Sequence, residues 1–171
     1  MRKPRLFHVS EEARIARFEP RANYRVEGEM VWAVDEPHLV NFLTPRDCPR
    51  ITYGSGPQTT DEDAVRFLGL VRRVVAFEAA RLDQVRACTL HIYEVPPESF
   101  EPELPEAGYW ISRTPVTPIG VRTETDLLSA LTRAGAEVRI LQDFWTLCDA
   151  VAASSLEFSI IHKELAAPRS G

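Results

Sequence analysis

The sequence lacks several patterns that would assign a class of protein at once. No apolar run approaches the roughly 20 residues that a membrane-spanning helix needs. There is no Gly-rich phosphate loop, no G-x-S-x-G motif and no H-E-x-x-H motif. The three cysteines, Cys48, Cys88 and Cys148, are widely separated and form no C-x-x-C pair. Neither a disulfide scaffold nor a structural zinc site is therefore expected.

The sequence also lacks an excess of positive charge, since its formal net charge is −5. A protein that binds nucleic acid through a general phosphate-neutralising surface needs clustered Lys and Arg, so this class is disfavoured. The basic start of the chain meets Glu11 and Glu12 after a few apolar residues and is no secretory signal, so a cytoplasmic location is expected. With 171 residues, 44% of them hydrophobic, we expect a single domain over 1–171 with an ordered core of about 5–164.

Apolar runs predict about seven short strands, and capping residues followed by apolar periodicity predict three helices. This irregular mixture does not have the βαβ rhythm of a doubly wound sheet, so an α+β domain with mixed or antiparallel strands is favoured. A single helical turn or a loop is expected after Ser10, and a short helix is expected from about His38. The strands are expected at Leu6–Val9, Met30–Val34, Arg50–Tyr53, Ala87–Val95, Gly108–Ser112, Glu137–Leu141 and Leu156–Ile161, and the helices at Asp61–Leu82, Glu124–Ala134 after a Thr123 cap, and Asp143–Ala152.

The helix expected at Asp61–Leu82 begins with three acidic residues and carries an apolar stripe at i, i+3, i+4 and i+7 spacing. Glu78 falls on that stripe. Either its stem packs at the edge of the stripe with its head in water, or it is a partly buried carboxylate that faces a site.

The stretch Val31–Arg50 holds the densest group of potentially reactive side chains. His38 follows Asp35 and Glu36 at a helix start, so it is either a solvated cap residue or an imidazole oriented by a carboxylate. His8 lies in the first apolar strand. It is either a packed, hydrogen-bonded ring or a donor and general base that faces a ligand.

Arginines and aromatic residues supply the other candidates. Arg46, Arg50 and Arg113 lie in or beside Pro-bounded loops, where a guanidinium group suits a phosphate or a structural salt bridge. Tyr109 and Trp110 face opposite ways on one strand, so one of them is exposed. An exposed aromatic side chain either stacks on a planar ring or covers the interface of a homodimer.

Cys48 is a separate candidate, since nearby arginines would lower its pKa and His38 would serve as a base. A metal site made of His8, His38 and Cys48 matches no standard zinc spacing, so no metal is expected.

The segments LFHVSEE, VWAVDEPHLVNFLTPRDCPR, GYWISRTPVTP and LEFSIIHK resemble an uncharacterised family of small bacterial proteins over essentially the whole chain. That resemblance implies no activity. The order of motifs is also similar to the ADP-ribosyltransferase-like superfamily. His8 matches its ribose-gripping first motif, and Trp32 matches its second motif of strand, acidic turn and helix. The glutamate of its third motif would fall near Tyr109 or Trp110, which leaves Glu106 as a substitute.

This second resemblance implies an ADP-ribosyltransferase-like cleft that binds NAD, ADP-ribose or another phosphate-bearing nucleotide, with transferase-like or phosphotransferase-like chemistry. The alternatives are a non-catalytic binding module or homodimer, and a thiol enzyme that uses Cys48. In the cleft the catalytic residues would be His8, His38 and Glu106, and the ligand-binding residues Ser10, Trp32, Arg46, Arg50, Tyr109, Trp110 and Arg113.

Overall fold

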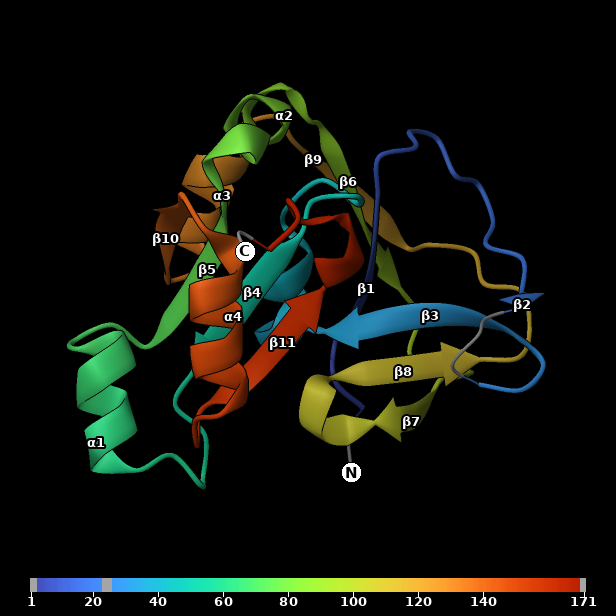
Figure 1. Ribbon diagram of the computed structural model, residues 1–171. Helices are drawn as coiled ribbons and strands as arrows, with labels where there is room; N and C mark the ends of the chain where they lie inside the picture. Colours follow the sequence, from blue (N-terminus) through green and yellow to red (C-terminus); the bar gives the residue numbers. More distant parts are fainter. Residues whose placement is uncertain (1–2, 23–25, 170–171) are drawn as a thin grey trace. The chain divides into compact units, whose positions relative to one another are not determined.

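The computed structural model describes residues 3–22 and 26–169 (Figure 1). The chain forms two compact units, unit 1 from Met1–Phe42 and Thr89–Glu124, and unit 2 from Leu43–Cys88 and Thr125–Gly171. Each unit therefore combines two stretches that lie far apart in the sequence. Strands and short helices alternate irregularly, which confirms the mixed α+β class. The single domain over 1–171 stays a prediction.

Unit 1 is built on an antiparallel sheet with the strand order β7-β8-β3-β1-β6-β9, and β2 also pairs with β3. Two short 3₁₀-helices, η1 (Glu36–Phe42) and η4 (Pro105–Ala107), follow β3 and β7. The strands are β1 (Leu6–Ser10), β2 (Arg21–Ala22), β3 (Glu29–Asp35), β6 (Leu90–Val95), β7 (Glu101–Leu104), β8 (Tyr109–Ser112) and β9 (Gly120–Glu124).

One face of the unit 1 sheet packs against loop residues to form a hydrophobic cluster. The loops are held by backbone hydrogen bonds in both directions between Phe18 and Val116. The hydroxyl of Tyr93 donates to Glu12 O at 2.8 Å and accepts from Ile15 N at 3.1 Å. The buried members are Leu6, Phe18, Val31, Ala33, Tyr93, Val95, Phe100 and Val116.

Of the two alternatives for the stretch after Ser10, the structure shows the loop and not the helical turn. Ser10 is the last residue of β1, and its hydroxyl accepts the backbone N–H of Glu12 at 3.0 Å. A serine side chain that bonds its own backbone two residues on favours a turn over a helix.

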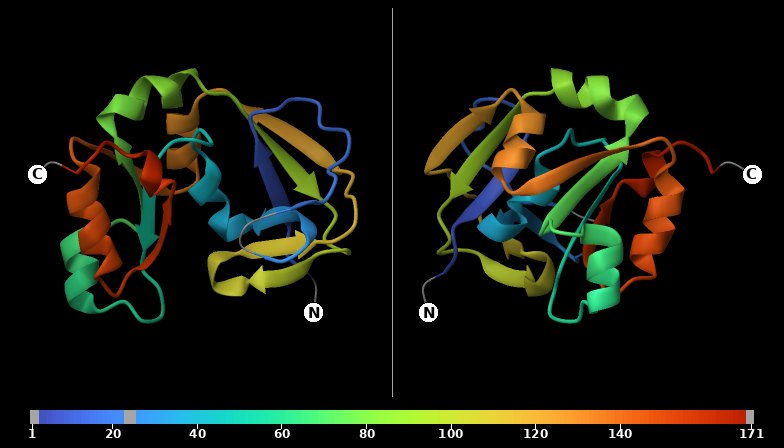
Figure 2. Two further views of the ribbon diagram at one scale, coloured as in Figure 1. Left: turned by 45° about the vertical axis from the view of Figure 1, so that its right-hand side comes forward. Right: turned by 90° about the vertical axis from the view of Figure 1, so that its left-hand side faces the viewer.

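Unit 2 is built on a four-stranded sheet with the order β10-β5-β4-β11, in which only the β10–β5 pair is parallel. Helix α4 runs alongside the sheet of this unit (Figure 2). The elements are β4 (Arg50–Gly54), α1 (Asp61–Asp63), the π-helical turn η2 (Ala64–Leu68), β5 (Arg73–Glu78), η3 (Ala79–Arg81), α2 (Leu82–Ala87), α3 (Leu127–Arg133), β10 (Ala136–Leu141), α4 (Phe144–Ala152), β11 (Glu157–Ile161) and η5 (Lys163–Leu165).

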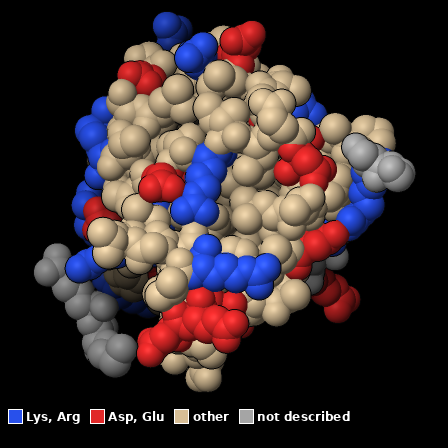
Figure 3. Space-filling model, turned by 60° about the vertical axis from the view of Figure 1, so that its left-hand side comes forward, with Lys and Arg blue, Asp and Glu red and all other residues tan. Residues whose placement is uncertain are grey.

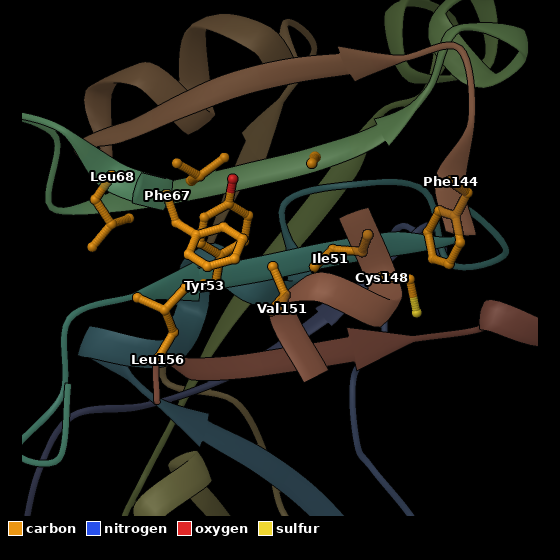
Figure 4. Close-up of a cluster of buried hydrophobic side chains, with 10 residues drawn as sticks. Ile51, Tyr53, Phe67, Leu68, Phe144, Cys148, Val151 and Leu156 are labelled. Carbon is orange, nitrogen blue, oxygen red and sulfur yellow. The ribbon is translucent and has the colours of Figure 1, made fainter. Parts of the chain in front are cut away.

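The core of unit 2 lies between the sheet and α4 (Figure 4). Phe144, Cys148 and Val151 are spaced at i, i+4 and i+7, so they project from one face of α4. The Tyr53 ring meets the Phe67 ring edge-on at a centroid distance of 6.3 Å. As predicted, Asp143 caps α4, because its carboxylate accepts Trp145 N at 3.3 Å and Thr146 N at 2.9 Å.

The long helix predicted over Asp61–Leu82 is wrong. Helical structure ends at Leu68, Gly69 has a φ of 59°, and Arg73–Glu78 is the strand β5. All of β5 except its first residue is buried, which is typical of a strand covered on both faces. Such a continuous apolar run fits a helical stripe as well as a strand, so its periodicity misleads.

Two further predictions need correction. Thr123 lies in β9, and α3 begins at Leu127 after an Asp126 cap whose Oδ1 accepts Ser129 N at 3.1 Å. The segment between β6 and β8, where no strand is among those expected, contains β7. Over the described residues the chain therefore has eleven strands and not about seven. In the same ranges no helix has the length and apolar character needed to cross a membrane.

Candidate functional site

The end of β3 places a carboxylate against an imidazole. Asp35 Oδ1 lies 2.6 Å from His38 Nδ1 and accepts the backbone N–H of His38 at 3.2 Å. Both side chains are 16% exposed. Since the carboxylate accepts, Nδ1 carries the proton and the neutral ring has its acceptor on Nε2. Asp35 therefore begins η1 as its cap and also orients His38, so His38 is the imidazole oriented by a carboxylate and not a solvated cap residue.

Gly108, in the turn between η4 and β8, packs directly against this pair. Its carbonyl accepts the backbone N–H of Asp35 at 3.0 Å. A Cβ atom at Gly108 would overlap Nδ1 and Cγ of His38 and would lie 2.6 Å from Asp35 Oδ1. Its φ of 71° adds a second reason for glycine, because side chains are strained in that region. Sequence reasoning missed this residue, although a glycine directly before an aromatic strand was a usable signal.

Aromatic rings continue the site along the neighbouring strands. The Tyr109 ring meets the Trp32 ring edge-on at 5.7 Å and the Phe42 ring at 5.9 Å. The buried indole Nε1 of Trp32 has no hydrogen-bond partner among the described residues. Trp110 points to the other face of the sheet, where it packs on the hydrophobic cluster of unit 1. Tyr109, and not Trp110, therefore packs with Trp32 and Phe42.

His8 is tied to the strand that carries Trp32. Its Nδ1 lies 2.8 Å from the Trp32 carbonyl oxygen, and its ring lies 4.5 Å from the Phe18 ring. A carbonyl only accepts, so Nδ1 donates and Nε2 is the acceptor of the neutral ring. Backbone pairing of β1 with β3 extends only to Phe7 and Val34. The His8 side chain thus satisfies a carbonyl beyond the paired residues, and its ligand-facing role stays a prediction.

The three candidate arginines have different surroundings. Arg50 is 3% exposed, and its Nη1 donates to the carbonyls of Cys48 at 3.1 Å and Arg46 at 3.3 Å. Its guanidinium therefore stabilises the PRDCPR loop of unit 2. Arg46 is exposed in the same loop. Arg113 is exposed in unit 1, where its Nη1 donates to Glu27 O at 3.3 Å.

Glu106 is exposed on η4, two residues before Gly108. Its catalytic role stays a prediction. On the face drawn in Figure 3, Lys and Arg side chains are interspersed with Asp and Glu. Among the described residues, no group of three or more His, Cys, Asp or Glu side chains is placed to hold a metal ion.

The hypothesis of a Cys48 thiol enzyme is wrong. Cys48 is fully buried, and its Sγ lies 3.6 Å from the Pro49 carbonyl. Burial raises the pKa of this thiol to about 11, and the nearby Arg50 lowers it by less. A thiol that is neutral and inaccessible at physiological pH is not an activated nucleophile.

Residues 7–166 match DUF6886, a family of unknown function, and the chain belongs to this family. The expectation of a family without an assigned activity is thereby confirmed. No curated protein and no solved structure matches the chain. The similarity to the ADP-ribosyltransferase-like superfamily therefore stays a prediction.

Proposed function

We propose that unit 1 binds a small nucleotide-like ligand, with a planar ring and hydroxyl groups, at the Asp35–His38 pair. The observation that carries this proposal is the 2.6 Å contact between His38 Nδ1 and Asp35 Oδ1, against which Gly108, the residue before Tyr109, is packed. NAD, ADP-ribose and other phosphate-bearing nucleotides combine the groups that such residues recognise.

The chemistry assigned to His38 follows from its fixed tautomer. With its proton on Nδ1, the ring presents Nε2 as a hydrogen-bond acceptor or general base for a ligand hydroxyl. If Nε2 takes the proton of the ligand hydroxyl, the carboxylate of Asp35 stabilises the resulting imidazolium. His8, with its own Nδ1 donating to Trp32 O, offers a second oriented acceptor in the same unit.

The aromatic residues support a ligand with a ring and a polar edge. A buried N–H group without an acceptor costs about 1–3 kcal/mol, so an acceptor supplied by a ligand to Trp32 Nε1 would recover free energy. Tyr109 and Phe42 would provide apolar ring surface. Arg113 is the candidate phosphate donor within unit 1, whereas Arg46 and Arg50 keep that role only as a prediction.

The test is isothermal titration calorimetry of the full chain with NAD, ADP-ribose and a panel of mononucleotides. We expect binding heat with at least one ligand, and its loss in His38→Ala. A matched control is His91→Ala, because His91 lies on β6 of the same unit with its ring bonded to Thr123. Absence of heat with every ligand, or equal loss in both variants, would contradict the proposal. Release of nicotinamide from NAD would then distinguish catalysis from binding alone.

A further inference from the structure

A short stretch that follows β11 is held in unit 2 through its backbone by side chains of other elements. Arg81 Nη2 donates to the carbonyl of Leu165 at 2.7 Å. Both carboxylate oxygens of Glu78 accept the N–H of Ala167, at 3.1 and 3.3 Å, and Trp145 Nε1 donates to the carbonyl of Ala167 at 2.8 Å. Three side chains thus bind three backbone groups of this stretch.

The stretch 165–169 is not a strand of the sheet. Its Ala166 packs against the hydrophobic cluster of unit 2. Further on, the two Nη atoms of Arg169 donate to the two carboxylate oxygens of Asp149 at 2.6 and 2.9 Å. The same guanidinium lies 4.2 Å from the ring centroid of Trp145. Backbone recognition is therefore joined by recognition of one arginine through a bidentate pair and a cation–π contact.

The hydrogen bonds between Glu78 and Ala167 satisfy a carboxylate that is buried in unit 2. It is 5% exposed at the end of β5, and a buried carboxylate is costly unless it is hydrogen-bonded. The N–H that it binds here belongs to Ala167, on a stretch that leaves β11 through His162 with a φ of 54°. A positive φ at a non-glycine residue is uncommon and marks a sharp change of chain direction.

We propose that Glu78, Arg81, Trp145 and Asp149 form a peptide-binding site for a short Ala-Ala-Pro-Arg type segment, filled here by residues 165–169 of the same chain. A small residue fits where Ala166 packs on the cluster, and Ala167 is exposed and is bound through its backbone. Pro168 keeps the residue before it extended and carries no N–H that needs an acceptor. Arg169 then reaches Asp149, so an arginine two residues after the bound amide determines specificity.

The tether explains how the site stays occupied. A segment joined to its site by a few residues has an effective concentration of about millimolar, so a free peptide competes poorly with it. Weakening the internal segment at Arg169 leaves the four site residues unchanged. The variant Arg169→Ala should therefore make the site accessible to a peptide in trans.

The experiment uses the full chain and a fluorescently labelled peptide of residues 163–169, followed by anisotropy. We expect saturable binding to Arg169→Ala and at least about tenfold weaker binding to the wild-type chain. Adding Asp149→Ala to Arg169→Ala should weaken binding about fivefold, in the range of exposed ion pairs. The matched control adds Asp83→Ala, which removes an exposed acid from α2 of the same unit and should leave binding unchanged.

Equal binding to the wild type and Arg169→Ala would place the peptide elsewhere and overturn the proposal. Binding to neither chain would mean that the segment is a fixed part of the fold, which also overturns it. A charge exchange tests the specificity of the arginine contact independently. Hydrogen exchange at the Ala167 amide should accelerate in Asp149→Arg and in Arg169→Asp and return toward the wild-type rate in the double variant. A double variant as fast as the single ones would exclude the pair as a determinant.

Discussion

His38 Nδ1 and the backbone N–H of His38 both meet one oxygen, Asp35 Oδ1, at 2.6 and 3.2 Å. A single carboxylate thus starts η1 and holds the imidazole in one orientation. Capping needs only an oxygen acceptor, whereas stabilising an imidazolium needs a negative charge. Substitutions at Asp35 can therefore separate the structural role from the chemical one.

Asp35→Ala should lower the free energy of unfolding by about 1–2 kcal/mol, because the cap is lost. Asp35→Asn keeps a good capping residue and should cost less than half as much, while it removes the charge from His38. Urea unfolding measures the first effect and calorimetric ligand titration the second. Asp47→Ala, at an exposed loop position, serves as the control and should change neither. Equal destabilisation by Asn and Ala would show that the charge, not the cap, supports the fold.

Gly108→Ala should destabilise the protein by about 2–4 kcal/mol, from left-handed backbone strain and overpacking together. The steric part comes from the overlap of its Cβ with His38 Nδ1. Gly135→Ala is the matched control. Gly135 has a φ of 82°, and a Cβ added there would meet no atom within 4 Å, so its substitution carries the strain of about 1–2 kcal/mol alone. Thermal unfolding of the two variants gives the difference. Equal costs would mean that Gly108 does not constrain the pair.

Local sequence signals predicted the elements whose ends carry caps or alternation. Asp143 begins α4, and the apolar run after Glu29 is β3, both as expected. The helix expected over Asp61–Leu82 failed because β5 is buried on both faces and its residues do not alternate. Burial on two faces is a tertiary property, and a local pattern does not contain it.

Within the candidate site, too, local contacts were predictable from the sequence and long-range contacts were not. The contact of Asp35 with His38 joins residues three positions apart at a cap, so the sequence suggested it. The contact with Gly108 depends on the pairing of β3 with β8, in which Val34 lies opposite Tyr109. That register is set by long-range strand pairing and was not visible in the chain. The prediction that arginines activate Cys48 failed for another reason. Their proximity in sequence does not show whether the thiol is buried, and burial raises its pKa more than Arg50 lowers it.

His8 provides a test of side-chain to backbone bonding in unit 1. Its Nδ1 donates to the Trp32 carbonyl at 2.8 Å. In His8→Asn the amide N–H₂ can replace that donor, whereas His8→Leu leaves the carbonyl without it. We expect Leu to be less stable than Asn by about 1 kcal/mol, despite its greater hydrophobicity. Urea unfolding of the two variants checks this. A more stable Leu variant would show that packing on Phe18, and not the hydrogen bond, is the main role of His8.

The last prediction concerns alkaline stability and Cys48. Burial raises the pKa of its thiol from 9.0 to about 11. Between these values the unfolded chain releases the proton while the folded chain keeps it, so the unfolded state binds fewer protons and stability falls as pH rises. The contribution of Cys48 is fully present below pH 9 and is lost as pH rises toward 11. The slope from this group is at most about 1.4 kcal/mol per pH unit.

Cys48→Ala should therefore lower stability at pH 8, because it removes a buried side chain, and should weaken the further loss between pH 9 and 11. Burial also raises the pKa of Tyr53, so part of the alkaline loss remains in the variant. Cys88→Ala is the control, because Cys88 is only partly buried, and it should retain the wild-type slope. Urea unfolding at four pH values from 8 to 11 measures these slopes. If wild type and Cys48→Ala lose the same free energy over that range, the Cys48 thiol binds its proton equally in the folded and unfolded chains. Its burial then makes no contribution to the pH dependence of stability.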